Sequence, residues 1–141
     1  MLDLKRVTLF TLYVPWDKSK IASEDAQDGE IEKNLDNGLE ETIKALHTCL
    51  NFAEFGDVKF VTSKQVIEER GEELLRDGIK CVESSIPITN MKDYARYMIY
   101  HLNEVVDTDF ALTIQHDGFI INPDAWRDDF LDYDYIGAPW P

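Results

Sequence analysis

The residues best suited to chemistry are Gln115-His116-Asp117-Gly118, which directly follow a run of apolar residues. An acid followed by a glycine at the end of a strand can present its carboxylate where the backbone approaches a ligand. Asp117 could therefore hold Mg²⁺ or Mn²⁺ against a diphosphate, because these hard cations take carboxylate and phosphate oxygens together. An ordinary tight turn explains the same residues equally well, since Asp-Gly is a favoured turn dipeptide.

A second unusual segment is residues 132–140, which combine aromatic side chains, acids, glycine and proline (DYDYIGAPW). Such a composition suits a ligand-facing loop that offers aromatic surfaces and nearby hydrogen-bond acceptors. Carbohydrates are bound by this combination of side chains, and so are peptides. The alternative is a segment that packs onto its own core.

Strands and helices must position both segments. Three apolar runs are typical of strands buried on both faces, namely residues 7–14, 58–61 and 110–114, and residues 79–82 are predicted to form a further strand. Apolar side chains recur at helical spacing in residues 35–53, 64–76 and 90–105, and residues 123–131 could form one more helix. This alternation predicts an α/β fold with a mostly parallel, Rossmann-like sheet flanked by helices.

The connections between these elements carry their own signals. Residues 16–34 are polar, show no period and are predicted to form a long loop. Gly56-Asp57 predicts a turn before the second strand, and Gly78 predicts the end of the second helix. Because ligands bind beyond the carboxyl ends of parallel strands, the residues after each predicted strand are candidates for a site.

The charge of the chain is strongly acidic and unevenly distributed. Asp and Glu outnumber Lys and Arg by 28 to 14; residues 17–41 hold nine acids and three bases, and residues 103–141 hold nine acids and one base. Solubility explains these blocks, as does a role in holding a divalent cation or mimicking a polyanion. Such a chain repels nucleic-acid phosphates and anionic lipid. No apolar run approaches the ~20 residues of a membrane span.

Two cysteines, Cys49 and Cys81, match no zinc or redox spacing and are predicted to be buried free thiols. We therefore expect a single cytoplasmic domain over residues 1–141, with no nucleic-acid or membrane partner.

The stretch from Tyr94 to Trp140 resembles the core of an uncharacterised family of glycosyltransferase-like proteins. Its signature runs from a helix through a strand to Gln-x-Asp-Gly, then a helix with a tryptophan, then Tyr-Asp-Tyr-Ile-Gly-Ala-Pro-Trp. The strand at residues 7–13 and the pair Thr62-Ser63 also fit this pattern. The family is similar to nucleotide-sugar transferases of the GT-A type.

The resemblance implies a nucleotide-binding half in which Gln115, His116, Asp117 and Gly118 take the place of the acidic metal motif. It implies that Asp117 contacts Mn²⁺ or Mg²⁺ and the donor diphosphate, and that Thr11 and Tyr13 lie near the nucleotide base. Asp134, Tyr135 and Trp140 are further expected at the nucleotide-sugar site. Family members continue past Ala-Pro-Trp, so residues 1–141 are expected to be the amino-terminal half of the enzyme.

The function expected from these observations is that of a nucleotide-sugar-dependent glycosyltransferase, or of its donor-binding half, with an acceptor that the sequence does not identify. A non-catalytic binding or assembly module that keeps the fold is the alternative. An acidic mimic of nucleic acid is disfavoured, because the charge forms two blocks instead of one long face. The exposed aromatic residues of the C-terminal region predict self-association there or a partner chain.

Overall fold

A computed structural model describes residues 1–15 and 28–138 of the chain, and for residues 28–37 it describes the backbone alone. The described residues contain one sheet in the order β3-β2-β1-β4, in which every pair of neighbouring strands is parallel. The strands are β1 (Leu2–Leu12), β2 (Ala53–Thr62), β3 (Lys80–Glu83) and β4 (Phe110–Thr113). The predicted Rossmann-like α/β fold is thereby confirmed.

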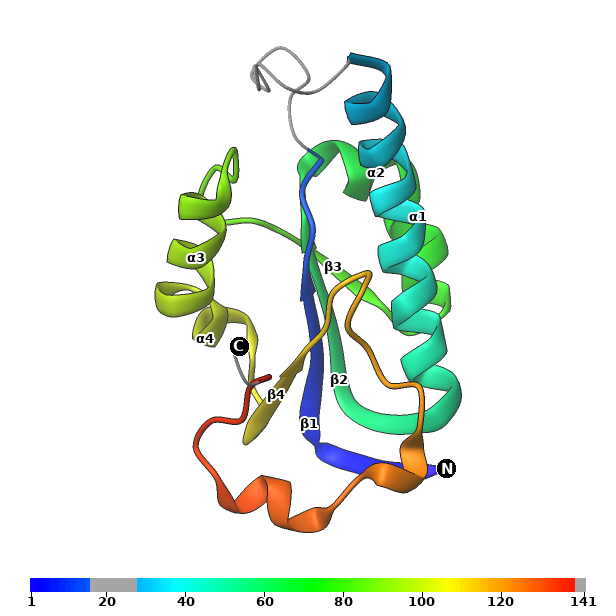
Figure 1. The fold of residues 1–141 in the computed structure, drawn as a ribbon, viewed down its shortest axis with the longest axis vertical. Coiled ribbons are helices and arrows are strands. Elements are labelled where there is room, and N and C mark those ends of the chain that lie inside the picture. Colours follow the sequence, from blue (N-terminus) through cyan, green and yellow to red (C-terminus); the bar gives the residue numbers. More distant parts are fainter. Residues whose placement is uncertain (16–27, 139–141) are drawn as a thin grey trace.

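Helices cover both faces of the sheet, with α1 and α2 on one side and α3 and α4 on the other (Figure 1). Their bounds are Asp28–Phe52 for α1, Lys64–Arg76 for α2, Met91–Tyr100 for α3 and Leu102–Val105 for α4. Alternate residues of β1 enter the two cores: Leu9 packs with α1 and α2, and Phe10 packs with Tyr97 of α3. Burial on both faces explains why this strand has no polar alternation.

Several predicted boundaries are wrong. Helix α1 begins at Asp28 instead of Leu35, and the remainder of the predicted loop, residues 16–27, lies outside the described residues. The predicted helix over residues 90–105 is interrupted at His101, where α3 ends and α4 begins. Met91 and Ala95, predicted on its buried face, are exposed. The predicted helix over residues 123–131 consists of two 3₁₀ turns, η2 (Pro123–Ala125) and η3 (Asp128–Asp132).

The predicted strand over residues 110–114 is half-exposed instead of buried. β4 lies at the edge of the sheet, and its residues Ala111 and Thr113 face solvent. The predicted end of the second helix is confirmed, because Gly78 follows α2 with a φ of 84°. Its N–H donates to the Leu75 carbonyl (3.0 Å), and the Ile79 N–H donates to the Leu74 carbonyl (2.9 Å). These two bonds close the last turn of α2 in the way that favours glycine at this position.

The predicted turn at Gly56-Asp57 is instead a bulge between two paired strands. Leu4 pairs with Phe55 and Thr8 pairs with Asp57, so that residues 5–7 of β1 lie opposite Gly56 alone. A Cβ atom at residue 56 would lie 2.1 Å from the Lys5 carbonyl oxygen. The absence of a side chain at Gly56 therefore lets β1 and β2 stay paired across the bulge.

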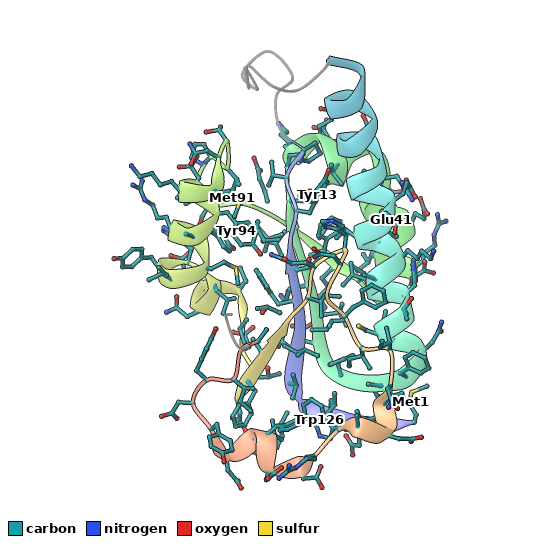
Figure 2. All side chains as sticks on the ribbon, viewed as in Figure 1. Met1, Tyr13, Glu41, Met91, Tyr94 and Trp126 are labelled. Atoms are coloured by element: carbon teal, nitrogen blue, oxygen red, sulfur yellow. The ribbon has the colours of Figure 1, made fainter. Side chains whose placement is uncertain are left out.

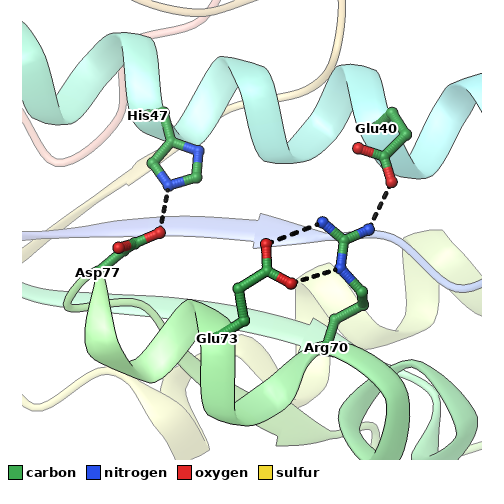
Figure 3. Close-up of polar contacts among 5 residues, drawn as sticks. All are labelled: Glu40, His47, Arg70, Glu73 and Asp77. Carbon is green, nitrogen blue, oxygen red and sulfur yellow. Dashed lines mark hydrogen bonds and ion pairs between the residues drawn. The ribbon is translucent and has the colours of Figure 1, made fainter.

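Polar contacts join α1 to α2 along their exposed sides (Figure 3). Arg70 of α2 donates to both carboxylate oxygens of Glu73, at 3.0 and 3.2 Å, and also contacts Glu40 of α1. About two helical turns further along α1, the His47 imidazole lies 3.0 Å from the carboxylate of Asp77, the residue that follows α2. These pairs hold the two helices in one layer. No described helix is long and apolar enough to span a membrane.

Candidate functional site

The order of the strands indicates where a ligand would bind. From β1 the chain moves outward through β2 to β3, and it then returns across the sheet to place β4 on the other side of β1. The direction of winding reverses between β1 and β4. In open parallel sheets, ligands bind at the carboxyl ends of the strands that flank this reversal. The residues that follow β1 and β4 are therefore the candidate site.

Residues 115–118 form a tight turn immediately beyond β4. The Gln115 N–H donates to the Gly118 carbonyl at 2.9 Å, and the Gly118 N–H donates to the Gln115 carbonyl at 3.1 Å. The turn is joined to β1, because the N–H of Ile114 donates to the Phe10 carbonyl (2.9 Å). His116 and Asp117 are exposed at its tip. The residues thus form the tight turn considered from the sequence, and the turn lies at the reversal point.

Asp117 is the acid best placed to contact a ligand at this point. Its carboxylate is exposed and has no hydrogen bond or ion pair within residues 1–15 and 28–138, and the space beside Gly118 is open. The described residues contain no group of three His, Cys, Asp or Glu side chains that could hold a metal ion. A divalent cation at Asp117 would therefore need oxygens from a ligand and from water. Mg²⁺ and Mn²⁺ are held in this way beside phosphates.

Gln115 is held to helix α3 by its side chain. Its Nε2 donates to the Tyr94 hydroxyl at 2.8 Å, across 21 residues of chain. Tyr94 is half-buried in the core beneath α3, next to the buried ring of Tyr97. Tyr94 could not be singled out from the sequence, because tyrosines spaced three residues apart in a helix ordinarily indicate packing. Nothing in the spacing shows which of them points to the turn.

Tyr13 follows β1 and lies against helix α1. A Cβ atom at Gly38 of α1 would come within 2.5 Å of the Tyr13 hydroxyl, so the missing side chain at residue 38 makes room for the ring. The Tyr13 N–H donates to the Val61 carbonyl at 3.0 Å and fixes the backbone beside β2. Figure 2 shows the side chain at the carboxyl end of β1. Gly38 lies inside a helical pattern, and this local signal could have indicated the close approach.

Two threonines at this end of the sheet are fully buried but differ in their hydrogen bonding. Thr11 donates its hydroxyl to the Ile114 carbonyl at 2.8 Å, which holds β1 against the segment leading to the turn. With 1% of its surface exposed, Thr11 positions the site and has no surface of its own for a ligand. The hydroxyl of Thr62, at the end of β2, has no hydrogen-bond partner among the described residues.

The C-terminal candidates lie at the opposite end of the sheet. Trp126 and Leu131 pack against Leu4 and Val7, near the amino ends of the strands, and Figure 2 shows Trp126 far from Tyr13. Tyr135 lines a shallow hollow of about 430 Å³ with residues of η3, and Asp134 is exposed beside it. The structure therefore does not bring Asp134 and Tyr135 to the turn at residues 115–118. Trp140 lies outside the described residues.

Comparison with known proteins gives one match, to part of the chain. Residues 78–141 are similar to a family described as a protein of unknown function (DUF5672). The matched region includes β3, α3, β4, the turn at residues 115–118 and the C-terminal segment, and it excludes β1 with Tyr13. No curated protein matches the chain. No solved structure matches it either.

Proposed function

We propose that the carboxyl end of the sheet binds the diphosphate of a nucleotide-sugar, as the donor site of a nucleotide-sugar-dependent glycosyltransferase. The observation that supports this proposal best is the exposed, unpaired carboxylate of Asp117 on a turn at the reversal point of a Rossmann-like sheet. The resemblance of residues 94–140 to glycosyltransferase-like proteins supports the same assignment.

The residues around the reversal point divide the binding among them. Asp117 would hold Mn²⁺ or Mg²⁺ together with the donor diphosphate, and the bound cation would neutralise the leaving diphosphate. Tyr13 offers an aromatic ring beside the same strand ends, where a nucleotide base could stack. Gln115, whose amide nitrogen is bonded to Tyr94, offers its amide oxygen to a hydroxyl of the ligand.

Electrostatics explains why the proposal requires a cation. Residues 12–15 and 113–118, which follow the two strands, contain no Lys or Arg, although a diphosphate carries a concentrated negative charge. The chain as a whole has a net charge of −14, so its long-range field repels an anion. Nucleotide binding at this end should therefore depend on a divalent cation.

Calorimetric titration with uridine and guanosine diphosphates, with and without Mn²⁺, tests the proposal. We expect Mn²⁺ to promote binding to the wild type and Asp117→Asn to remove that effect. The free energy of unfolding should change by no more than about 0.5 kcal/mol, because the carboxylate is exposed and has no partner within the described residues. Asp124→Asn, an equally isosteric change at an exposed acid on η2, serves as the control and should leave binding intact.

A wild type that binds neither nucleotide in the presence of Mn²⁺ would contradict the proposal. The fold would then serve a non-catalytic binding or assembly module, which is the alternative expected from the sequence. Metal-dependent binding that survives Asp117→Asn but is lost in Asp124→Asn would move the site to the other end of the sheet.

A further inference from the structure

The outer face of α3 combines exposed apolar side chains with unpaired positive charge. We define this face by Met91, Lys92, Arg96, Ile99 and Tyr100. Met91, Ile99 and Tyr100 are 67%, 72% and 68% exposed. Lys92 and Arg96 stand one helical turn apart, and neither has an ion-pair partner in the described part of the chain. Apolar patches of this kind commonly mark interaction sites.

The acid within the same helix offsets this charge only in part, because Asp93 interacts with Arg96 electrostatically without forming an ion pair. Asp93 turns its carboxylate back to Thr89, whose N–H and hydroxyl donate to it at 2.9 and 2.8 Å. Lys44 and Arg76, the other bases without an ion pair in the described part of the chain, lie on two different helices, α1 and α2. The outer face of α3 is thus a local reversal of sign on an acidic molecule.

The C-terminal aromatic segment, residues 132–136, shows the opposite charge with the same apolar character. Tyr133, Tyr135 and Ile136 are 59%, 84% and 55% exposed. Asp132 and Asp134 alternate with these residues, and neither has an ion-pair partner among the described residues. The segment therefore presents two free acids set among exposed aromatic and aliphatic side chains.

We propose that two copies of this chain associate, with the outer face of α3 of each copy receiving the C-terminal aromatic segment of the other. The two surfaces are opposite in sign, and they match in the number of their charges without an ion pair and in apolar content. Elsewhere the acidic charge of the molecule opposes contact between copies, so the interface forms where the sign reverses. Both surfaces lie on the same side of the sheet in Figure 1. One two-fold axis can therefore satisfy both contacts and close the assembly as a dimer.

The interface can be tested in the full chain by exchanging the charges of the two surfaces and measuring the dimer dissociation constant by sedimentation equilibrium. The first variant carries Lys92→Glu and Arg96→Glu, and the second carries Asp132→Lys and Asp134→Lys. In a dimer of either variant alone, like charges face each other at both contacts. We therefore expect its dimer dissociation constant to rise about tenfold or more. In a mixed dimer of the two variants, unlike charges face each other at both contacts. The mixture should therefore form a mixed dimer with near wild-type affinity.

The mixture separates an interface from a folding defect, because a damaged fold is not repaired by a second damaged chain. Lys44→Glu with Arg76→Glu makes the same change of charge at the other two unpaired bases and should leave the dimer intact. Raising the salt concentration should weaken the wild-type dimer, because the paired charges are exposed. The proposal is overturned by a wild type that stays monomeric at high micromolar concentration, or by separate variants that do not recover in the mixture. Neither result depends on nucleotide binding.

Discussion

The two ends of the parallel sheet use their polar side chains differently. Near the amino ends, the charged side chains carried by the strands are paired: Asp57 accepts from Lys80 at 2.9 Å and lies 3.6 Å from Lys59, and Arg6 donates to Asp109 at 3.0 Å. The buried Nε1 of Trp126, which packs against this end, has no hydrogen-bond partner among the described residues. At the carboxyl ends, the hydroxyl of Thr62 and the carboxylate of Asp117 have no partner among the described residues.

This difference separates residues that maintain the fold from residues available to a ligand. Groups that already bond to one another contribute to stability, and removing one of them leaves its partner unsatisfied. Groups without a partner contribute little or are destabilising in the isolated chain, and they can gain from binding. Substitutions at the amino end should therefore reduce stability, whereas substitutions of the free groups at the carboxyl end should not.

The largest effect is expected at the amino end, from Gly56→Ala. The new methyl group would lie 2.1 Å from the Lys5 carbonyl oxygen, which is backbone and cannot move without separating β1 from β2. We expect the free energy of unfolding to fall by about 3 kcal/mol. Urea denaturation measures the change. Gly118→Ala, in the open turn at the other end, is the control and should change stability by less than about 0.5 kcal/mol.

A smaller loss of stability is expected from Asp57→Asn, which removes the negative charge that both Lys59 and Lys80 contact. Burial alone would raise the pKa of Asp57, but the hydrogen bonds from Lys80 and the Val58 N–H, with both lysine charges, lower it below its ordinary value. We expect a loss of about 2 kcal/mol near neutral pH, because a charged hydrogen bond is removed from a side chain that is 13% exposed.

Because of this pKa shift, the effect of Asp57→Asn on the free energy of unfolding should depend on pH. Because the pKa is lower in the folded state, the carboxylate stabilises the protein above its unfolded pKa of about 4 and loses that contribution as the pH falls through the folded value. Urea denaturation at neutral and acidic pH should therefore show the wild type and Asp57→Asn converging in acid. Asp109→Asn breaks an exposed pair with Arg6 and should change stability by less than about 1 kcal/mol. A difference between wild type and Asp57→Asn that does not narrow in acid would contradict the assignment.

The arrangement of the sheet could be predicted from the sequence because the central strands are buried on both faces. The run around Leu9 and Phe10 is continuous, and each of these residues enters a different core. The bulge could not be predicted in the same way. Gly56-Asp57 has the composition of a turn, and only the pairing of Leu4 with Phe55 shows that β2 continues through it.

The candidate site could be predicted in part, for a similar reason. The turn at residues 115–118 follows a strand and carries a local signal, so its position was expected and is observed. The bond from Gln115 to Tyr94 joins distant parts of the chain and leaves no local pattern. Tyr135 was assigned to the same site on composition and resemblance, but the packing of Trp126 and Leu131 takes this segment to the other end of the sheet.

The smallest expected effect is a gain in stability, from Thr62→Val. Valine keeps the shape and β-branching of threonine but removes a buried hydroxyl that has no partner among the described residues. Because an unsatisfied buried polar group is unfavourable, the free energy of unfolding should rise by about 1 kcal/mol. Thr11→Val is the matched control: its hydroxyl donates to the Ile114 carbonyl, so the same change should lower the free energy of unfolding by about 1 kcal/mol. If Thr62→Val also lowered stability, the hydroxyl would have to be bonded in solution, and the contrast between the two ends of the sheet would then rest on the carboxylate of Asp117 alone.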